Sequence, residues 1–322
     1  MIYWEPRVAI PRDLSADLFA GVAKGARVRR MAGETMGTDW SLSIVGGGAG
    51  IRPLVEAVLA EVIAESSLWE PKSEICRFNR AKAGARVPLS PGFAAVVDSA
   101  LRLAVESGGA FDPRVGRLSA HWGFGPDGVR SSDGPPPAVS ASPELIDGAL
   151  TQPGGVWLDL NGIAKGQAVD RVAQALLAAG NRHFLIGIGG EYRGEGVRPD
   201  GQPWWVEIEQ PPGAAMPPLR VALSGLSVAT SGDYRRAFHR DGRRLSHSLD
   251  PRSGQPIPEG IASVAVLGKS CMLADGEATA ITVLGQEAGL RWASERGLAA
   301  QMLLREGRSF REILTPALVE ML

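Results

Sequence analysis

The chain has 322 residues, of which 44% are hydrophobic and 21% charged, a composition typical of a folded globular protein. This length is enough for a substantial core, built as one large domain or as two lobes. A formal net charge of −1 gives no global argument for binding nucleic acid or an anionic membrane, so any polyanion must be bound locally. The two cysteines, Cys76 and Cys271, are too few for a disulfide framework and lack metal-ligand spacing.

Residues 1–30 predict an irregular N-terminal extension that packs over a later element, followed by a domain over 31–322. Charged residues interrupt every apolar run in the extension, so we predict no secretory signal peptide. No later segment approaches the ~20 apolar residues of a membrane-spanning helix. We therefore expect a cytoplasmic protein, or a periplasmic one if a leader has been removed.

The first half of the chain predicts one strand and two helices before a turn-rich segment. Thr38–Val45 alternates apolar and polar residues, as a half-buried strand does. Apolar side chains over 54–63 recur at helical spacing. Pro91 follows the capping residue Ser90 and begins a second helix, which a later Gly-Gly pair ends. Residues 126–145 are rich in turn formers and predict a surface excursion.

The second half mixes strands and helices without a strict βαβ rhythm. We predict strands at Val156–Leu160, His183–Ile188, Trp205–Glu209 and Val221–Leu223, helices at Gly166–Ala179 and 274–296, and a hairpin of 301–304 with 309–314. This order predicts a mixed α+β fold rather than a doubly wound parallel sheet.

The predicted helix 274–296 carries an aspartate and a threonine four residues apart, Asp275 and Thr279. Side chains at this spacing lie on the same helix face, so a carboxylate and a hydroxyl point to one place. Both are hard oxygen donors of the kind that Mg²⁺ accepts. For an isolated pair, a helix cap and a threonine inside the core is the better interpretation, so the rest of the chain must decide.

Several other segments are richer in polar residues and glycine than a plain fold requires. In LDLNGIAKGQAVD (158–170), a tight turn delivers Lys165 to a helix start, where backbone amides and an ammonium suit a phosphate group. A plain strand-to-helix turn explains this segment equally well when it is taken alone. His247 precedes Asp250 in a polar, turn-rich stretch, although a lone histidine is more often structural than catalytic.

Taken in order, eight short stretches resemble the FAD:protein FMN transferase family, often called ApbE-like. The resemblance runs from about Met36 to Leu284. The stretches are MGT (36–38), SEICRFN (73–79), GAFDP (109–113), LDLNGIAKGQAVD (158–170), IGGE (188–191), ATSGDY (229–234), SHSLDP (246–251) and ADGEATA (274–280).

The resemblance implies both a fold and an activity. The implied fold has a largely antiparallel sheet core with packed helices, in a T-fold-like architecture with a ligand cleft between two lobes. Members of the family transfer the FMN half of FAD onto a threonine hydroxyl of a target protein and release AMP, with Mg²⁺. The implied partners are therefore FAD as substrate and an acceptor protein with a flavinylation threonine.

The resemblance also implies site residues, carried over motif by motif. The metal ligands would be Asp275, Thr279 and the main-chain carbonyl of Ala164. The flavin nucleotide would be bound by Met36, Ala110, Phe111, Asp112, Lys165, Asp170, His247 and a turn formed by Thr230, Ser231 and Gly232. Lys165 would neutralise phosphate charge. The base for the incoming threonine would be Asp275 or His247, and we rank Asp275 higher because it lies closer to the metal.

Three other functions remain open. A hydrolase would split FAD into FMN and AMP with water in place of the threonine, using the same ligands. A flavin-binding carrier would bind FAD without turnover, and its metal pair would be dispensable. An inactive relative is least favoured, because Lys165, Asp275 and Thr279 are all retained.

Overall fold

The computed structural model describes residues 5–12, 15–22, 24–126, 128, 136, 141–232, 237–240, 243–307 and 309–322. Most of the predicted 126–145 excursion lies outside these residues. The chain divides into two compact units, each assembled from separate stretches of sequence. Unit 1 comprises Met1–Leu59, Lys165–Arg235 and Gly260–Leu322, and unit 2 comprises Ala60–Ala164 and Arg236–Glu259. One domain over 31–322, with a cleft between two lobes, stays a prediction.

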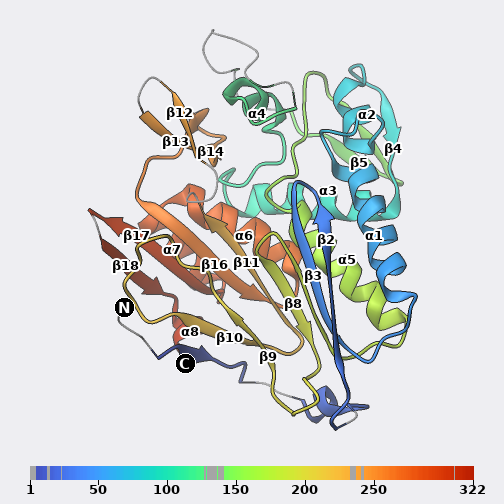
Figure 1. The fold of residues 1–322 in the computed structure, drawn as a ribbon. Helices are drawn as coiled ribbons and strands as arrows, with labels where there is room; N and C mark the ends of the chain where they lie inside the picture. The colour runs from blue at the N-terminus through green and yellow to red at the C-terminus, as the bar shows by residue number, and fades with distance from the viewer. Residues whose placement is uncertain are drawn as a thin grey trace. The chain divides into compact units, whose positions relative to one another are not determined.

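Unit 1 is built on an eight-stranded sheet in which every neighbouring pair is antiparallel (Figure 1). In spatial order the strands are β18 (Ser309–Leu314), β17 (Ala299–Glu306), β16 (Ile261–Gly268), β11 (Leu226–Gly232), β8 (Glu191–Glu195), β7 (Phe184–Ile188), β3 (Thr38–Val45) and β2 (Val28–Thr35). The sheet confirms the predicted α+β class with a largely antiparallel core, and it includes the predicted 301–304/309–314 hairpin as β17 and β18.

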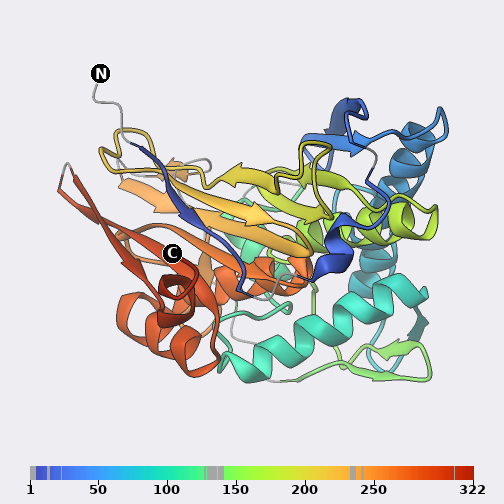
Figure 2. The same cartoon turned by 90° about the horizontal axis from the view of Figure 1, so that it is seen from below.

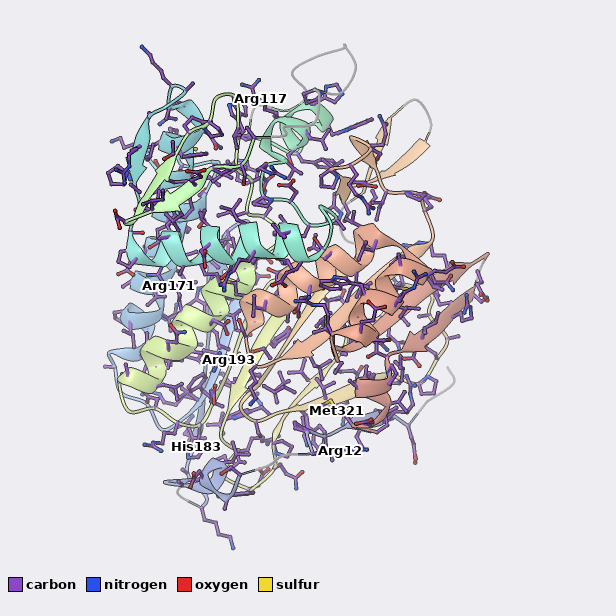
Figure 3. All side chains as sticks on the ribbon, turned by 180° about the vertical axis from the view of Figure 1, so that it is seen from behind. Arg12, Arg117, Arg171, His183, Arg193 and Met321 are labelled. Atoms are coloured by element: carbon purple, nitrogen blue, oxygen red, sulfur yellow. The ribbon has the colours of Figure 1, made fainter. Side chains whose placement is uncertain are left out.

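Two helices of unit 1, α5 (Ala164–Ala178) and α6 (Cys271–Leu284), lie on one face of this sheet (Figure 3). Helix α6 packs on β11 and β16 through an apolar cluster that includes Ala274, Ala278 and Ile281. The single helix predicted over 274–296 is wrong. Gly285 (φ +86°) separates α6 from α7 (Gln286–Glu295), because a positive φ ends helical geometry and only glycine adopts it readily.

The N-terminal segment packs against residues near the C-terminus. It also forms a strand and a 3-10 turn, whereas an irregular extension was predicted. Strand β1 (Arg7–Ala9) runs parallel to β10 (Leu219–Leu223), which pairs antiparallel with β9 (Trp204–Glu207) (Figure 2). Arg7 forms a 2.6 Å ion pair with Glu312 of β18. A 3-10 turn η1 (Ala16–Phe19) follows, and a short C-terminal helix α8 (Pro316–Val319) ends the chain.

Unit 2 contains short helices and strands, and α1 (Ile51–Ser66) leads into it from unit 1. Ser90 Oγ accepts a hydrogen bond from Phe93 N, which confirms the predicted cap of α3. No helix among the described residues is both long and apolar enough to cross a membrane. The elements of unit 2 are α2 (Glu74–Arg80), β4 (Arg86–Pro88), α3 (Pro91–Glu106), α4 (Gly116–Trp122), β5 (Glu144–Ile146), β6 (Ala149–Thr151), β12 (Ala237–Arg240), β13 (Arg243–Ser246), β14 (Leu249–Asp250) and β15 (Gln255–Pro256).

The predicted strand Val156–Leu160 is not formed as a strand. Its only bridge among the described residues pairs Trp157 with Val115. The Asn79 side chain replaces a second strand, since its amide donates to Leu158 O (2.9 Å) and its carbonyl accepts from Leu158 N (2.7 Å). Val156, Leu158 and Leu160 are buried, and the Asn79 side chain rather than a ladder satisfies the backbone of Leu158.

Candidate functional site

Helices α5 and α6 begin side by side, and each supplies a carboxylate to the start of the other. Asp275, on the second turn of α6, accepts a hydrogen bond from the backbone N–H of Gly166 at 3.0 Å, with its Oδ2 atom. The helices approach so closely that a Cβ at position 166 would overlap the Cys271 carbonyl and lie 2.8 Å from Met272 Cα. Only glycine fits at position 166 without moving backbone.

The reciprocal contact comes from Asp170 on α5. Its carboxylate accepts hydrogen bonds from Cys271 N (3.1 Å), Met272 N (3.1 Å) and Ser270 Oγ (2.8 Å), which are the first donors of α6. Arg193 of β8, labelled in Figure 3, adds an ion pair at 2.7 Å. Four protein donors therefore surround the carboxylate that the family resemblance assigns to the nucleotide. Its contacts are those of a helix cap.

Lys165 lies directly before Gly166 and pairs with a residue that the sequence interpretation had not assigned. Its Nζ atom lies 2.5 Å from Glu191 Oε1, at the first residue of β8. The Glu191 side chain is 1% exposed, and its Oε2 atom has no hydrogen-bond partner among the described residues. The stem of Lys165 passes Gly189 (φ +63°), where a Cβ would lie 3.4 Å from Lys165 Cδ and 2.9 Å from Thr38 Cγ2.

Burial dominates the electrostatics of this cluster. Desolvation raises the pKa of Glu191 to about 7, against the opposing charge of Lys165. Desolvation likewise raises the pKa of Asp275, although Lys165 and the Gly166 N–H favour its ionised form. For Lys165 itself, burial lowers the pKa, but the charges of Asp275 and Glu191 outweigh it and the net shift is upward. Lys165 therefore keeps its charge between two carboxylates.

The oxygen donors of this region suit a divalent cation. Asp275 is only 3% exposed, and its Oδ1 atom accepts no hydrogen bond from the described residues. Half-buried Thr279 follows one helical turn later on α6, and the carbonyl of Ala164 stands at the start of α5. A carboxylate, a hydroxyl and a main-chain carbonyl form the hard-oxygen set that Mg²⁺ accepts, so the residues fit the predicted metal.

Two further predicted nucleotide contacts of unit 1 lie on the sheet. Met36 and Gly37 form the two-residue hairpin between β2 and β3, and Met36 has a φ of +50° that side-chain-bearing residues rarely adopt. The second contact, Thr230 to Gly232, is not a turn as predicted. These residues end β11 and pair with Ala265 to Ser263 of β16, because the alternation of β11 continues through the polar stretch.

The remaining predicted residues belong to unit 2. Ala110 and Phe111 are 1% and 4% exposed, and Phe111 N donates to Ser107 Oγ. Asp112 is paired with Arg114 through both carboxylate oxygens, at 2.8 Å and 2.6 Å. His247 is half-buried, two residues before β14.

Inside unit 2, backbone hydrogen bonds join the loop after Phe111 to the segment before Lys165. The sequence analysis did not predict these contacts. Asp159 N donates to Pro113 O at 2.7 Å, and Gly116 N donates to Trp157 O at 2.9 Å. The buried Asp159 carboxylate accepts from Asn161 N at 2.9 Å and from the Ser119 side chain. Desolvation raises the pKa of Asp159, and these donors oppose that shift.

The structure thus brings Lys165, Asp170, Asp275 and the unpredicted Glu191 together around the starts of α5 and α6. The signal that could have identified Glu191 was a carboxylate at the end of a buried apolar strand, directly after Gly189 and Gly190. A buried charge there requires a partner. The roles of all predicted site residues stay predictions.

Comparison with known proteins places this geometry in a family. The model of the ApbE family matches residues 36–302. A FAD:protein FMN transferase of Haemophilus influenzae is 33% identical over 94% of this chain and 93% of its own, and one of Vibrio cholerae is 36% identical over 92% and 93%. The apo structure of Pseudomonas stutzeri flavinyl transferase ApbE superposes with a TM-score of 0.84 at 38% identity, covering 92% of this chain and 97% of that one. This chain therefore belongs to the ApbE family.

Proposed function

We propose that this protein is an FAD:protein FMN transferase that uses Mg²⁺ and modifies a threonine of its acceptor. The name of its curated relatives, at 33% and 36% identity over nearly the whole chain, supports the transferase activity. The observation that carries the site is Asp275, a buried carboxylate with one protein donor and one oxygen without a hydrogen bond among the described residues.

Asp275, Thr279 and the Ala164 carbonyl would hold the metal. When bound, Mg²⁺ would supply positive charge to the diphosphate of FAD, on which negative charge grows as a phosphorus–oxygen bond breaks. Lys165 adds a fixed ammonium next to the same carboxylate, and its upward pKa shift supports a permanent charge. Glu191 pairs with that ammonium and keeps it in place without exposing it fully to water.

The transfer exchanges the phosphoanhydride bond of FAD for a phosphoester bond to the acceptor. The threonine oxygen of the acceptor forms a bond to the phosphorus of the FMN half, and the bond to the bridging oxygen breaks, so AMP leaves with that oxygen. The hydroxyl proton passes to a base, for which Asp275 and His247 have the suitable chemistry. We keep Asp275 ahead of His247, because its carboxylate belongs to the proposed metal site.

For the nucleotide we propose the residues that the family resemblance indicates. The strained φ of Met36 supports a role for the β2–β3 turn, because such strain persists where the structure holds a side chain in place. Ala110, Phe111 and the Thr230–Gly232 end of β11 complete the proposal. Asp112 and Asp170 have the least support, since protein donors already occupy their carboxylates.

The test is incubation of the purified protein with FAD, Mg²⁺ and a candidate acceptor protein that carries a flavinylation threonine. We expect the acceptor to gain the mass of FMN and AMP to be released in equal amount. Replacement of the acceptor threonine by alanine should abolish both. Release of FMN and AMP without acceptor would indicate the hydrolase instead, and FAD binding without any AMP would indicate the carrier.

A further inference from the structure

Two buried carboxylates, those of Glu191 and Asp275, attract the Lys165 ammonium. Its Nζ atom lies 2.5 Å from Glu191, while the charge of Asp275 also favours the ammonium form. An ammonium placed on Asp275 would neutralise the carboxylate that is proposed to bind the metal. Lysine and cation would then compete for the same oxygen atoms, so what holds Lys165 on Glu191 affects the metal site.

The buried position of Glu191 destabilises the folded protein. Its side chain is 1% exposed and its Oε2 atom has no hydrogen-bond partner among the described residues, and burial of a carboxylate in this state opposes folding. Pairing with Lys165 satisfies only one of its oxygens. A buried polar atom left without a partner needs an explanation beyond packing.

The turn before Glu191 lies along the same lysine. A Cβ at Gly189 would lie 3.4 Å from Lys165 Cδ, an ordinary van der Waals distance, so the stem of Lys165 runs beside this turn. Two residues later the chain supplies the carboxylate that receives the ammonium. The β7–β8 turn therefore lies beside the Lys165 stem, and Glu191 directly after it pairs with the ammonium.

We propose that Glu191 is a positioning residue: its carboxylate holds the Lys165 ammonium off Asp275, so that Asp275 stays available to a divalent cation. The inference rests on the metal role proposed above for Asp275. Glu191 contacts neither the metal nor the reacting atoms in this account. Its effect passes entirely through Lys165.

The test is direct metal binding in the absence of FAD. Mn²⁺, a paramagnetic probe for the Mg²⁺ site, is titrated into the metal-free full-length protein and free Mn²⁺ is measured by electron paramagnetic resonance. We expect Glu191→Gln to weaken Mn²⁺ binding by about 10- to 100-fold, the usual range for a residue that supports a metal ligand from behind. In the Lys165→Met background the same substitution should have little effect, because no ammonium remains to be held.

Glu312→Gln is the matched control, since it also removes the carboxylate of an ion pair in unit 1, with Arg7, and should leave Mn²⁺ binding unchanged. If Glu191→Gln does not fold, Glu191→Asp replaces it in both backgrounds, because the shorter side chain keeps the charge but not the reach. Equal weakening with and without Lys165, or no weakening in either background, would overturn the inference.

The outcome for Asp275→Ala separates the two proposals. Mn²⁺ binding that this substitution removes, but that Glu191→Gln does not change, overturns only the role of Glu191. Mn²⁺ binding that Asp275→Ala leaves intact contradicts the metal site itself and the inference with it.

Discussion

Two buried carboxylates lie near the start of α6, and their surroundings differ. One comes from α5 and the other from the second turn of α6 itself. Asp170 reaches the start from α5 and receives four protein donors: two backbone amides, a serine hydroxyl and the guanidinium of Arg193. Asp275 stands on the second turn and receives one, the Gly166 amide, together with the nearby charge of Lys165. Both are under a tenth exposed.

The difference shows how to distinguish a carboxylate that stabilises the fold from one that serves a ligand. The four donors around Asp170 match the roughly four acceptor positions of a carboxylate, so they account for it without a ligand. Asp275 retains an oxygen that accepts no hydrogen bond from the described residues, at a cost to stability that burial increases. Burial and charge alone do not distinguish Asp170 from Asp275 as candidate ligand-binding residues.

Asp275→Ala should produce the largest effect, and on activity rather than stability. We expect FMN transfer to fall by about 100- to 1,000-fold or more, because charge on the diphosphate is no longer neutralised. Only one protein hydrogen bond is lost, so unfolding free energy should change by about 1–2 kcal/mol or less. Transfer kinetics and urea denaturation measure the two quantities. Loss of folding with activity per folded molecule retained would contradict the assignment.

Asp170→Ala should show the opposite pattern. It removes one of the two carboxylates paired with Arg193, which keeps Glu195, and leaves the first amides of α6 uncapped, so we expect a loss of about 3–5 kcal/mol in unfolding free energy. Asp170→Asn, which keeps one acceptor oxygen, should lose less. A raised KM for FAD with unchanged stability would instead favour direct contact with the nucleotide.

A smaller effect is expected for Thr279→Val, which removes the hydroxyl and keeps the shape. The Mg²⁺ concentration that gives half-maximal transfer should rise about tenfold, within the range for changes around metal ligands. Thr282→Val on the same helix is the control, because Thr282 is not a proposed ligand and its hydroxyl donates to Ala278 O at 2.7 Å. Equal shifts in both variants would show that Thr279 acts through the helix and not through a metal.

The smallest effect concerns the pH dependence of stability. The pKa of Glu191 is about 7 in the folded protein against an ordinary value of 4.5, so the folded state binds more protons between these limits. Its contribution to stability is present below about pH 4.5 and is lost as the pH rises through about 7. In denaturation of the metal-free protein across this window, the unfolding free energy should fall less steeply with pH for Glu191→Gln than for the wild type. Identical slopes would contradict the raised pKa.

Local signals in the sequence were sufficient for much of the fold. The alternation of Thr38–Val45 and the Ser90–Pro91 start of α3 depend on neighbours in the chain, and both predictions are confirmed. The break at Gly285 was missed, because a single glycine inside a helical pattern is compatible with a continuous helix. Val156–Leu160 was read as a strand because its apolar run does not reveal that Asn79 provides the hydrogen bonds.

Only those site residues that lie within the family motifs could be predicted from the sequence. The family resemblance indicates Lys165, Asp275 and Thr279, whose roles stay predictions, and the helical spacing of Asp275 and Thr279 is confirmed by α6. The partnership of Lys165 with Glu191, 26 residues away, and that of Asp170 with Cys271, 101 residues away, depend on tertiary contacts that no local pattern encodes.

The close approach at Gly166 limits how this site can be moved into other proteins. An engineer who transplanted only the Asp275–Thr279 turn would lose the amide that orients the carboxylate, since that amide belongs to another helix. A host with any side chain at the position of Gly166 would force the two helix ends apart. The smallest transferable part is therefore a pair of crossed helix starts, with glycine at their point of contact.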